Sequence, residues 1–168
     1  PGRRAAPAGT TLWRGAGTAF TVLPPLSNKL PDDPKNGFEP VGGIAEYLAV
    51  VAVRKDLGVH TLTDLVKLAK ANPGKLTYGS AGLASFGHIA GEIIKRETGI
   101  SMLHIPFTGS ADATTALAGG QIRLPLDGAG VRIAEAGRVP ALAAFGHTRH
   151  PGLPHPPPPP PPRPPRHP

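Results

Sequence analysis

The sequence contains no cysteine, which excludes a disulfide framework and a thiolate metal site. It has only two tyrosines and one tryptophan, too few rings to form a stacking platform for nucleic-acid bases. No apolar run approaches the roughly 20 residues that a membrane-spanning helix requires. We therefore expect no covalent cross-link, no membrane span and no nucleic-acid partner.

The sequence also has few acidic residues, and its formal net charge is +7. Part of the excess lies at the two ends, and removing Arg3, Arg4, Arg163 and Arg166 lowers the charge to +3. A basic surface for an anionic polymer or membrane is therefore not indicated. The sequence begins at Pro1 and shows no signal peptide, so a mature or truncated product is expected.

Strand and helix patterns alternate between residues 47 and 145. The apolar run Tyr47–Val53 is typical of a strand buried on both faces, and Thr61-x-x-Asp64 is a capping-box pattern at the start of a helix. This alternation predicts an α/β fold with a largely parallel sheet. Further strands are expected at 76–79, 102–105, 122–126 and 139–145, and helices at about 85–98, from Ser110 to Gly119, and at 129–136.

The stretch Leu76–Glu92 combines a strand, a glycine-serine turn and a helix start. Gly79, Ser80 and Gly82 suit a tight turn, and Ser85 is placed to cap the helix that follows. Ser80 is a second candidate for that capping role. A helix N-terminus presents unpaired N–H groups and a partial positive charge, so the stretch predicts a seat for a carboxylate or a phosphate.

A second loop repeats this design. Phe107 and Gly109 lead to Ser110, a second candidate N-cap, and Asp112 falls in the first turn of the expected helix. Ligands of open α/β sheets bind outside the carboxyl ends of the strands, where both loops are expected to lie.

Other features support weaker interpretations. Thr11–Trp13 resembles a short strand that enters a strand-to-helix turn at Gly15–Thr18. Pro125 and Pro140 fall within expected strands and should be edge positions or weak points, because proline cannot donate to a ladder. Segment 151–168 holds 12 of the 23 prolines and should be extended without a packed core. It is interpreted as an unstructured extension, with an SH3 ligand as the alternative.

Catalytic and metal-binding interpretations fit poorly. His88, His104 and Asp127 lack the H-x-x-x-H spacing of a metal site, and the turn around Ser80 lacks the G-x-S-x-G of a hydrolase. His88 is a candidate for ligand contact, core packing or loop support, and His104 for packing or loop support. We expect no enzyme activity, no metal and no cofactor.

Several motifs occur together and in order. They are LPxDP at 30–34, FxPVG at 38–42, LVKLAKANPG at 65–74, LTYGSAG at 76–82 with Ser85 and His88, AGE at 90–92, HIPFxGS at 104–110, LxGGQ at 117–121, and Asp127. On these residues the chain resembles the periplasmic solute-binding proteins of the tripartite tricarboxylate transporter family, also called Bug or TctC-like receptors. The resemblance covers about residues 5–153.

The resemblance implies a type II periplasmic-binding-protein-like fold of two α/β lobes. Residues 1–55 would form part of lobe one, residues 56–138 lobe two, and residues 139–150 a strand crossing back, followed by the tail 151–168. It implies a periplasmic, monomeric receptor that delivers a small carboxylate to membrane transporter subunits or a sensor. Candidate ligands are di- or tricarboxylates, acidic amino acids and aromatic acids. The implied ligand-binding residues are Gly79, Ser80, Ala81, Gly82, Ser85, His88, Phe107, Gly109, Ser110, Asp127, Gly15, Gly17 and Thr18.

Departures from the family pattern indicate an incomplete lobe one. The family begins with a strand and a Pro-Gly-Gly loop that are absent here, and proline repeats replace its closing helices. The chain therefore resembles a fragment or truncated relative of such a receptor. The alternatives are a non-functional fragment of a receptor or an α/β hydrolytic enzyme.

Overall fold

The computed structural model describes residues 8–27, 30, 33–34, 36–46, 49–145 and 153. The chain divides into two compact units, Pro1–Glu46 (unit 1) and Tyr47–Pro168 (unit 2). The sequence placed the end of lobe one at residue 55, and the assignment of residues to lobes remains a prediction. Apart from Leu153, the proline-rich segment 151–168 lies outside the described residues.

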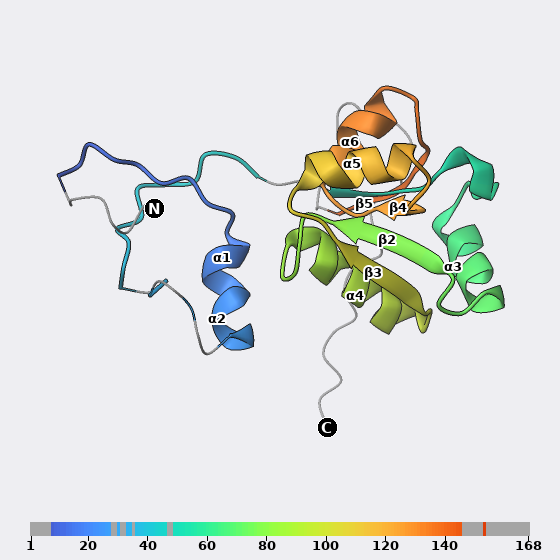
Figure 1. Cartoon of the computed structure of the whole chain (residues 1–168), viewed down its shortest axis with the longest axis horizontal. Helices are drawn as coiled ribbons and strands as arrows, with labels where there is room; N and C mark the ends of the chain where they lie inside the picture. The colour runs from blue at the N-terminus through green and yellow to red at the C-terminus, as the bar shows by residue number, and fades with distance from the viewer. Residues whose placement is uncertain are drawn as a thin grey trace. The chain divides into compact units, whose positions relative to one another are not determined.

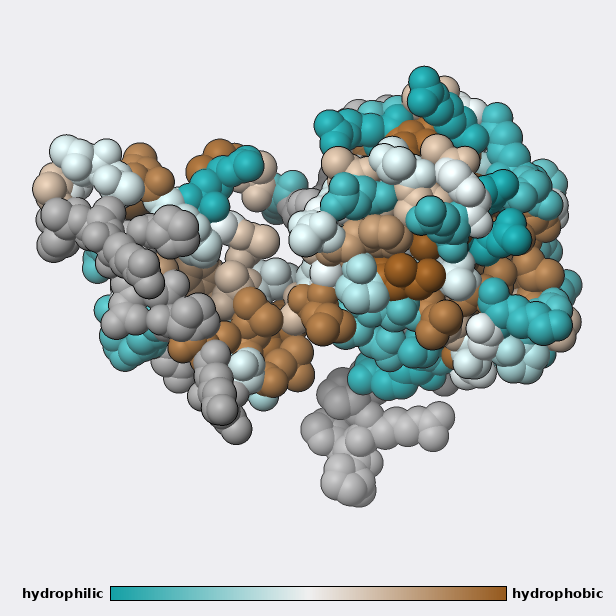
Figure 2. All heavy atoms as spheres, viewed as in Figure 1, coloured by the Kyte–Doolittle hydropathy of each residue, from teal (hydrophilic) through white to brown (hydrophobic). Residues whose placement is uncertain are grey.

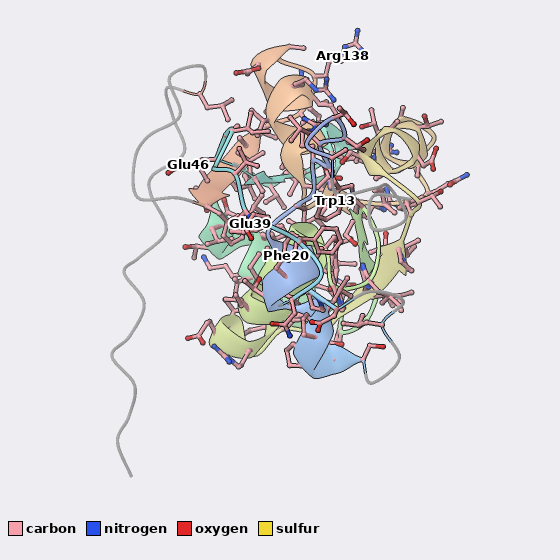
Figure 3. All side chains as sticks on the ribbon, turned by 90° about the vertical axis from the view of Figure 1, so that its left-hand side faces the viewer. Trp13, Phe20, Glu39, Glu46 and Arg138 are labelled. Atoms are coloured by element: carbon pink, nitrogen blue, oxygen red, sulfur yellow. The ribbon has the colours of Figure 1, made fainter. Side chains whose placement is uncertain are left out.

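Unit 1 contains two short helices, α1 (Thr18–Thr21) and α2 (Leu23–Leu26). An aromatic cluster joins α1 to its flanking segments, because the Trp13 ring lies 5.3 Å from that of Phe20 and 5.1 Å from that of Phe38. Figure 3 labels Trp13 and Phe20 in this cluster. None of the described residues of unit 1 is buried, and hydrophobic atoms lie on the surface of its helical segment (Figure 2). This unit therefore has no closed apolar core among its described residues.

The strand expected at Thr11–Trp13 is wrong, since these residues form no regular secondary structure. A strand needs a neighbour to pair its backbone groups, and the described part of unit 1 contains no strand. Gly15 is therefore not in a strand-to-helix turn. It lies under the Trp13 ring, which a Cβ at this position would overlap. Gly17 is the N-cap residue of α1 and accepts a hydrogen bond from Thr21 Oγ1 at 3.1 Å.

Three parallel strands form the centre of unit 2, in the order β3 (Met102–Pro106), β2 (Leu76–Ser80) and β4 (Leu124–Pro125). Helix α3 (Leu62–Ala71) precedes β2, and the helices that follow the strands are α4 (Phe86–Thr98), α5 (Ser110–Ala118) and α6 (Gly128–Glu135). Figure 1 shows α4 on one side of the parallel strands and α5 and α6 on the other. Parallel strands need such crossover helices, and the predicted α/β fold is confirmed.

A second, antiparallel pair lies beside this sheet. It consists of β1 (Ala49–Ala52), whose residues are all buried, and β5 (Ala141–Phe145). A 3₁₀ turn, η2 (Lys55–Leu57), follows β1. The Arg54 N–H donates to the Arg123 carbonyl oxygen at 3.1 Å, so the end of this pair is connected to the segment that enters β4.

Pro125 occupies an edge position, as the sequence predicted, whereas Pro140 lies just outside a strand. Pro125 lies in β4, the edge strand of the three-stranded sheet, and Pro140 immediately precedes β5. The Pro140 carbonyl oxygen accepts a hydrogen bond from the Val53 N–H at 3.1 Å. The strand expected at 122–126 is shorter than predicted, because Pro125 lacks the N–H that would extend the ladder.

Helix α4 packs closely on β2 because small residues face the strand. A Cβ at Gly91 would overlap the Tyr78 ring, and Ala90 and Ile94 are also buried on this face. Tyr78 is itself fully buried and belongs to the larger of two apolar clusters, together with Leu65 of α3. This contact fixes the position of the α4 N-terminus relative to the end of β2.

Helix α3 begins at the predicted capping box. The Thr61 Oγ1 accepts a hydrogen bond from the Asp64 N–H at 3.1 Å, and the Asp64 carboxylate accepts one from the Thr61 N–H at 3.1 Å. The Thr61 hydroxyl also donates to this carboxylate at 2.7 Å and lowers the pKa of Asp64.

We expect Thr61→Ala to lower the free energy of unfolding by about 1 kcal/mol, because the first turn of α3 loses its cap. The lowered pKa of Asp64 stabilises the fold above the unfolded-state pKa, and this contribution disappears as the pH falls through the folded-state value. The difference between Thr61→Ala and wild type should therefore shrink in acid. Urea unfolding at neutral and acid pH measures it, with Thr61→Ser as the control that keeps the hydroxyl. An unchanged urea midpoint for Thr61→Ala would contradict the capping role.

Candidate functional site

The carboxyl ends of the three parallel strands of unit 2 each lead to the N-terminus of a helix. The connections are 81–85 between β2 and α4, 107–109 between β3 and α5, and 126–127 between β4 and α6. The second connection is joined to the end of β2, because the Phe107 N–H donates to the Ser80 carbonyl oxygen at 3.0 Å. Figure 1 shows these strand ends at one edge of unit 2. Helix N-termini gathered at such an edge create a positive potential that favours an anion.

The 81–85 loop has an unusual backbone. Gly82 has φ +123° and Ala84 has φ +59°, a region that residues with side chains rarely adopt. A Cβ at Gly82 would lie 3.3 Å from the Phe107 carbonyl oxygen, so the two loops also meet here. The conformation of 81–85 must therefore be held by its surroundings.

Ser85 caps α4 as predicted, since its hydroxyl accepts a hydrogen bond from the His88 N–H at 3.4 Å. Ser80 does not share this role, so that expectation is wrong. Ser80 is the last residue of β2 and is fully buried. Its Oγ accepts from the Gly82 N–H at 3.2 Å, lies 3.0 Å from the Gly82 carbonyl oxygen and 2.7 Å from His104 Nε2. Ser80 thus organises the loop from within the sheet.

The second loop differs from the prediction at its cap. The N-cap residue of α5 is Gly109, in extended backbone with φ −178°, and no side chain caps the helix. Ser110 is the first helical residue, and its carbonyl oxygen accepts from Thr114 Oγ1 at 2.8 Å. Thr108 Oγ1 instead donates to the Asp112 carboxylate at 2.8 Å across this first turn. The N–H groups at the start of α5 therefore have no competing side-chain cap.

The remaining predicted residues lie in different places. Asp127 is buried between β4 and α6, and its carbonyl oxygen accepts from the Gly130 N–H at 3.1 Å. Gly79 is in β2 at a point where a Cβ would lie 3.0 Å from the Phe107 ring. Gly15, Gly17 and Thr18 belong to unit 1, and their contribution to a site remains a prediction.

Three aromatic rings stack behind the 81–85 loop. The His104 ring lies 4.8 Å from the Tyr78 ring and 4.2 Å from the His88 ring, with interplanar angles of 26° and 16°. The Tyr78 hydroxyl donates to the Glu92 carboxylate at 2.9 Å. Packing or loop support was predicted as a candidate role for both histidines, but their stack with Tyr78 was not predicted. The sequence contains these residues but does not show that they meet, because the contact depends on the parallel register that pairs Tyr78 with His104.

The stack changes the acidity of its members. Burial lowers the pKa of His104, and the nearby His88 lowers it further, which favours a neutral imidazole. Burial raises the pKa of the Tyr78 phenol, so this hydroxyl remains a donor at neutral pH. Lys95 is the main cause of the lowered pKa of Glu92, and the Tyr78 hydroxyl acts in the same direction.

The arrangement gives little support to catalysis or metal binding. The close approach of Ser80 and His104 resembles a nucleophile–base pair, but the Ser80 hydroxyl is buried and bonded to Gly82. Within the described residues, no group of three or more His, Asp or Glu side chains could hold a metal ion. A hollow of about 380 Å³ lies elsewhere, between α5 and α6, and none of the predicted ligand-binding residues lines it.

Comparison with known proteins identifies the family. Residues 3–158 match the model of the tripartite tricarboxylate transporter family receptor, TctC. The chain belongs to the TctC receptor family. This family consists of solute-binding receptors rather than enzymes, in agreement with the absence of a catalytic motif.

Relatives of known structure share the fold of this TctC chain. Rpa4515 of R. palustris, solved with adipate, is 34% identical with a TM-score of 0.73, and the match covers 78% of this chain and 44% of that protein. The periplasmic binding protein BugD is 28% identical with a TM-score of 0.70, covering 76% and 43%. These likenesses confirm the predicted periplasmic-binding-protein-like fold.

Curated sequences give the same result. A UPF0065 protein of Bordetella pertussis is 37% identical over 114 residues, which are 68% of this chain and 35% of that protein. The TctC chain described here thus spans less than half the length of these relatives. No helix in the described ranges has the length and apolar character needed to cross a membrane.

Proposed function

We propose that the chain is part of a periplasmic receptor that binds a small carboxylate, with unit 2 supplying one side of the binding cleft. The observation that carries the proposal is the pair of adjacent loops, 81–85 and 107–109, at the N-termini of α4 and α5. The same fold in Rpa4515, 34% identical to this chain, was solved with adipate. Adipate is a small dicarboxylate, the class of ligand that such an edge favours.

The chemistry of the loops suits a carboxylate. The first N–H groups of a helix have no partner within the helix, and together with the helix dipole they favour a negative charge. Ser85 uses one such group in α4, whereas the N-cap residue of α5, Gly109, provides no side-chain cap. We assign to the ligand-binding site Gly79, Ser80, Ala81, Gly82, Ser85, His88, Phe107, Gly109, Ser110 and Asp127. Ser80, being buried, would act through the position of Gly82.

The assignment of residues to lobes is part of this proposal. In this proposal residues 1–55 contribute to lobe one, including Gly15, Gly17 and Thr18, while residues 56–138 form lobe two and residues 139–150 cross back. The antiparallel pair of β1 and β5 is suited to such a connection, because it places residues 49–52 and 141–145 side by side in opposite directions. The proposed partners are the membrane subunits of a tricarboxylate-type transporter, or a sensor.

We expect adipate to bind the full chain and to raise its melting temperature, whereas the uncharged analogue adipamide should do neither. Isothermal titration calorimetry and thermal shift measure both effects, and malate and an aromatic acid extend the panel. A chain that gives no heat and no thermal shift with any carboxylate would contradict the proposal.

A pair of variants tests whether the ligand binds at the carboxyl edge of the sheet. Gly82→Ala puts a side chain at φ +123°, and the strain of about 1–3 kcal/mol should distort the loop and weaken adipate binding about tenfold or more. Gly74→Ala is the matched control, because Gly74 has φ +72° but lies before β2, at the opposite edge. Equal losses of affinity in the two variants would indicate a site elsewhere.

A further inference from the structure

The stack of Tyr78, His104 and His88 connects three elements of unit 2, namely β2, β3 and α4. The His104 ring centroid lies 4.8 Å from that of Tyr78 and 4.2 Å from that of His88, with interplanar angles of 26° and 16°, so the three rings form a continuous stack. Each histidine also extends a nitrogen toward the segment of chain that links β2 to α4. The stack therefore lies between the sheet and the loop that we propose to bind ligand.

Each histidine is linked to one of the two residues of the 81–85 loop that have positive φ. His88 Nδ1 accepts a hydrogen bond from the Ala84 N–H at 3.1 Å, and Ala84 has φ +59°. His104 Nε2 lies 2.7 Å from Ser80 Oγ, and Ser80 in turn holds both backbone groups of Gly82, which has φ +123°. The two histidines thus hold the loop at Ala84 and at Gly82, the two positions where its φ is positive.

These contacts specify protonation states. An Nδ1 that accepts from an N–H carries no proton, so His88 is neutral with its hydrogen on Nε2. A His104 with hydrogen on Nε2 donates to Ser80, which leaves the Ser80 hydroxyl to donate to the Gly82 carbonyl oxygen. If His88 takes up a proton at Nδ1, two donors face each other at Ala84 and that bond is lost.

Few charged groups face the histidines. On α4 the Glu92 carboxylate lies one turn beyond His88 and is shared between the Tyr78 hydroxyl and Lys95 Nζ, which donate at 2.9 and 2.8 Å. From β3 the facing titratable group is His104, and from β2 it is Tyr78. Glu92 is thus paired within its own network. If both histidines were protonated, their two positive charges would lie at ring-stacking distance from each other.

We propose that His88 and His104 are positioning residues that hold the 81–85 loop in its ligand-binding conformation, and that protonation of His88 releases it. The proposal rests on the carboxylate-binding function proposed above. Histidine is the side chain whose charge ordinarily changes between about pH 5 and 8. Carboxylate affinity should therefore fall as the solution becomes mildly acidic.

The test compares two replacements of His88. His88→Asn places an amide oxygen near the position of Nδ1, so it can still accept from Ala84 but cannot take up a proton. His88→Phe keeps a ring in the stack but offers no acceptor. His60→Asn, which replaces an exposed histidine before α3, is the control for the loss of a titratable histidine.

Adipate affinity is measured by calorimetry at about pH 8 and pH 6. We expect wild type and His60→Asn to lose about three- to tenfold in affinity between these values, and His88→Asn to lose less than about twofold. At about pH 8, His88→Phe should bind more weakly than His88→Asn. The ionisation of adipate acts equally on every variant, so the differences between variants carry the result. Matching pH profiles for His88→Asn and wild type would overturn the proposal.

A readout without ligand separates this proposal from the proposed function. Nitrogen-15 spectra of the histidine side chains report the protonation of His88 Nδ1, and hydrogen exchange reports protection of the Ala84 amide. We expect an unprotonated Nδ1 at about pH 8 and faster Ala84 exchange in His88→Phe than in His88→Asn. If no carboxylate binds but these results hold, the function fails and the positioning role stands. A protonated Nδ1 at about pH 8, or equal Ala84 exchange in both variants, would overturn the positioning role.

Discussion

Gly87→Ala is expected to destabilise unit 2 by about 3 kcal/mol, because there is no space for a methyl group where α4 meets the end of β4. A Cβ at Gly87 would overlap the Leu126 carbonyl oxygen, and would lie 2.8 Å from the Leu126 carbonyl carbon and 3.2 Å from Ser80 Cβ. Two of these atoms belong to the backbone and cannot rotate away. The helix must therefore separate from the sheet edge, which also disturbs the Ser80 hydrogen bonds.

Urea unfolding followed by circular dichroism measures the effect. For a unit of this size a loss of 1 kcal/mol lowers the melting temperature by roughly 4–8 °C, so the change should be large. Gly119→Ala is the matched control, since Gly119 has φ −77° and its Cβ would lie 3.5 Å from the nearest atom, the Thr115 carbonyl oxygen. We expect the control to stay within about 0.5 kcal/mol of wild type. A Gly87→Ala variant with the wild-type urea midpoint would show that α4 can shift without cost.

Features that depend on local sequence were predicted correctly. The capping box at Thr61 and the N-cap at Ser85 are both present. Each depends on residues within one turn of helix, so the chemistry is contained in a few adjacent positions. The alternation of strands and helices likewise sufficed for the α/β class.

Features that depend on distant residues were predicted poorly. The strand at Thr11–Trp13 lacked a pairing partner in the described part of unit 1, and the hydroxyl of Ser80 bonds to His104, 24 positions along the chain, rather than to the helix. Ser110 was predicted as a cap on residue type alone, but it is already the first helical residue, and the N-cap residue is Gly109 in extended backbone. In each case a tertiary contact or backbone path outweighed the local preference.

The candidate site shows the same division. The loops 81–85 and 107–109 were located from glycine and serine spacing, because such turns have a local signature. The ring stack behind them was not, because Tyr78 and His104 meet only through the register of two parallel strands. The sequence thus predicted the two loops and named His88 and His104 as candidates for packing or loop support, but it did not predict the stack that these rings form with Tyr78.

We expect Tyr78→Ala to lower the free energy of unfolding by about 3–5 kcal/mol, because it leaves a ring-sized cavity in the core. Tyr78 is fully buried, its ring fills the space beside Gly91, and it forms one end of the stack with His104. Without it His104 loses its support on the side of β2. The Ser80 contact that holds Gly82 should therefore weaken along with the fold.

Tyr78→Phe separates the ring from its hydroxyl. It keeps the stack and removes only the hydrogen bond to Glu92, so we expect a loss of about 1 kcal/mol at neutral pH. The pKa of Glu92 is lower in the folded chain than in the unfolded chain, so its contribution is present above the unfolded-state pKa and disappears as the pH falls through the folded-state value. The deficit of Tyr78→Phe should shrink over that acid range, while that of Tyr78→Ala should persist. Urea unfolding at neutral and acid pH measures both, and equal deficits for the two variants would show that the hydroxyl, rather than the ring, holds this part of the sheet.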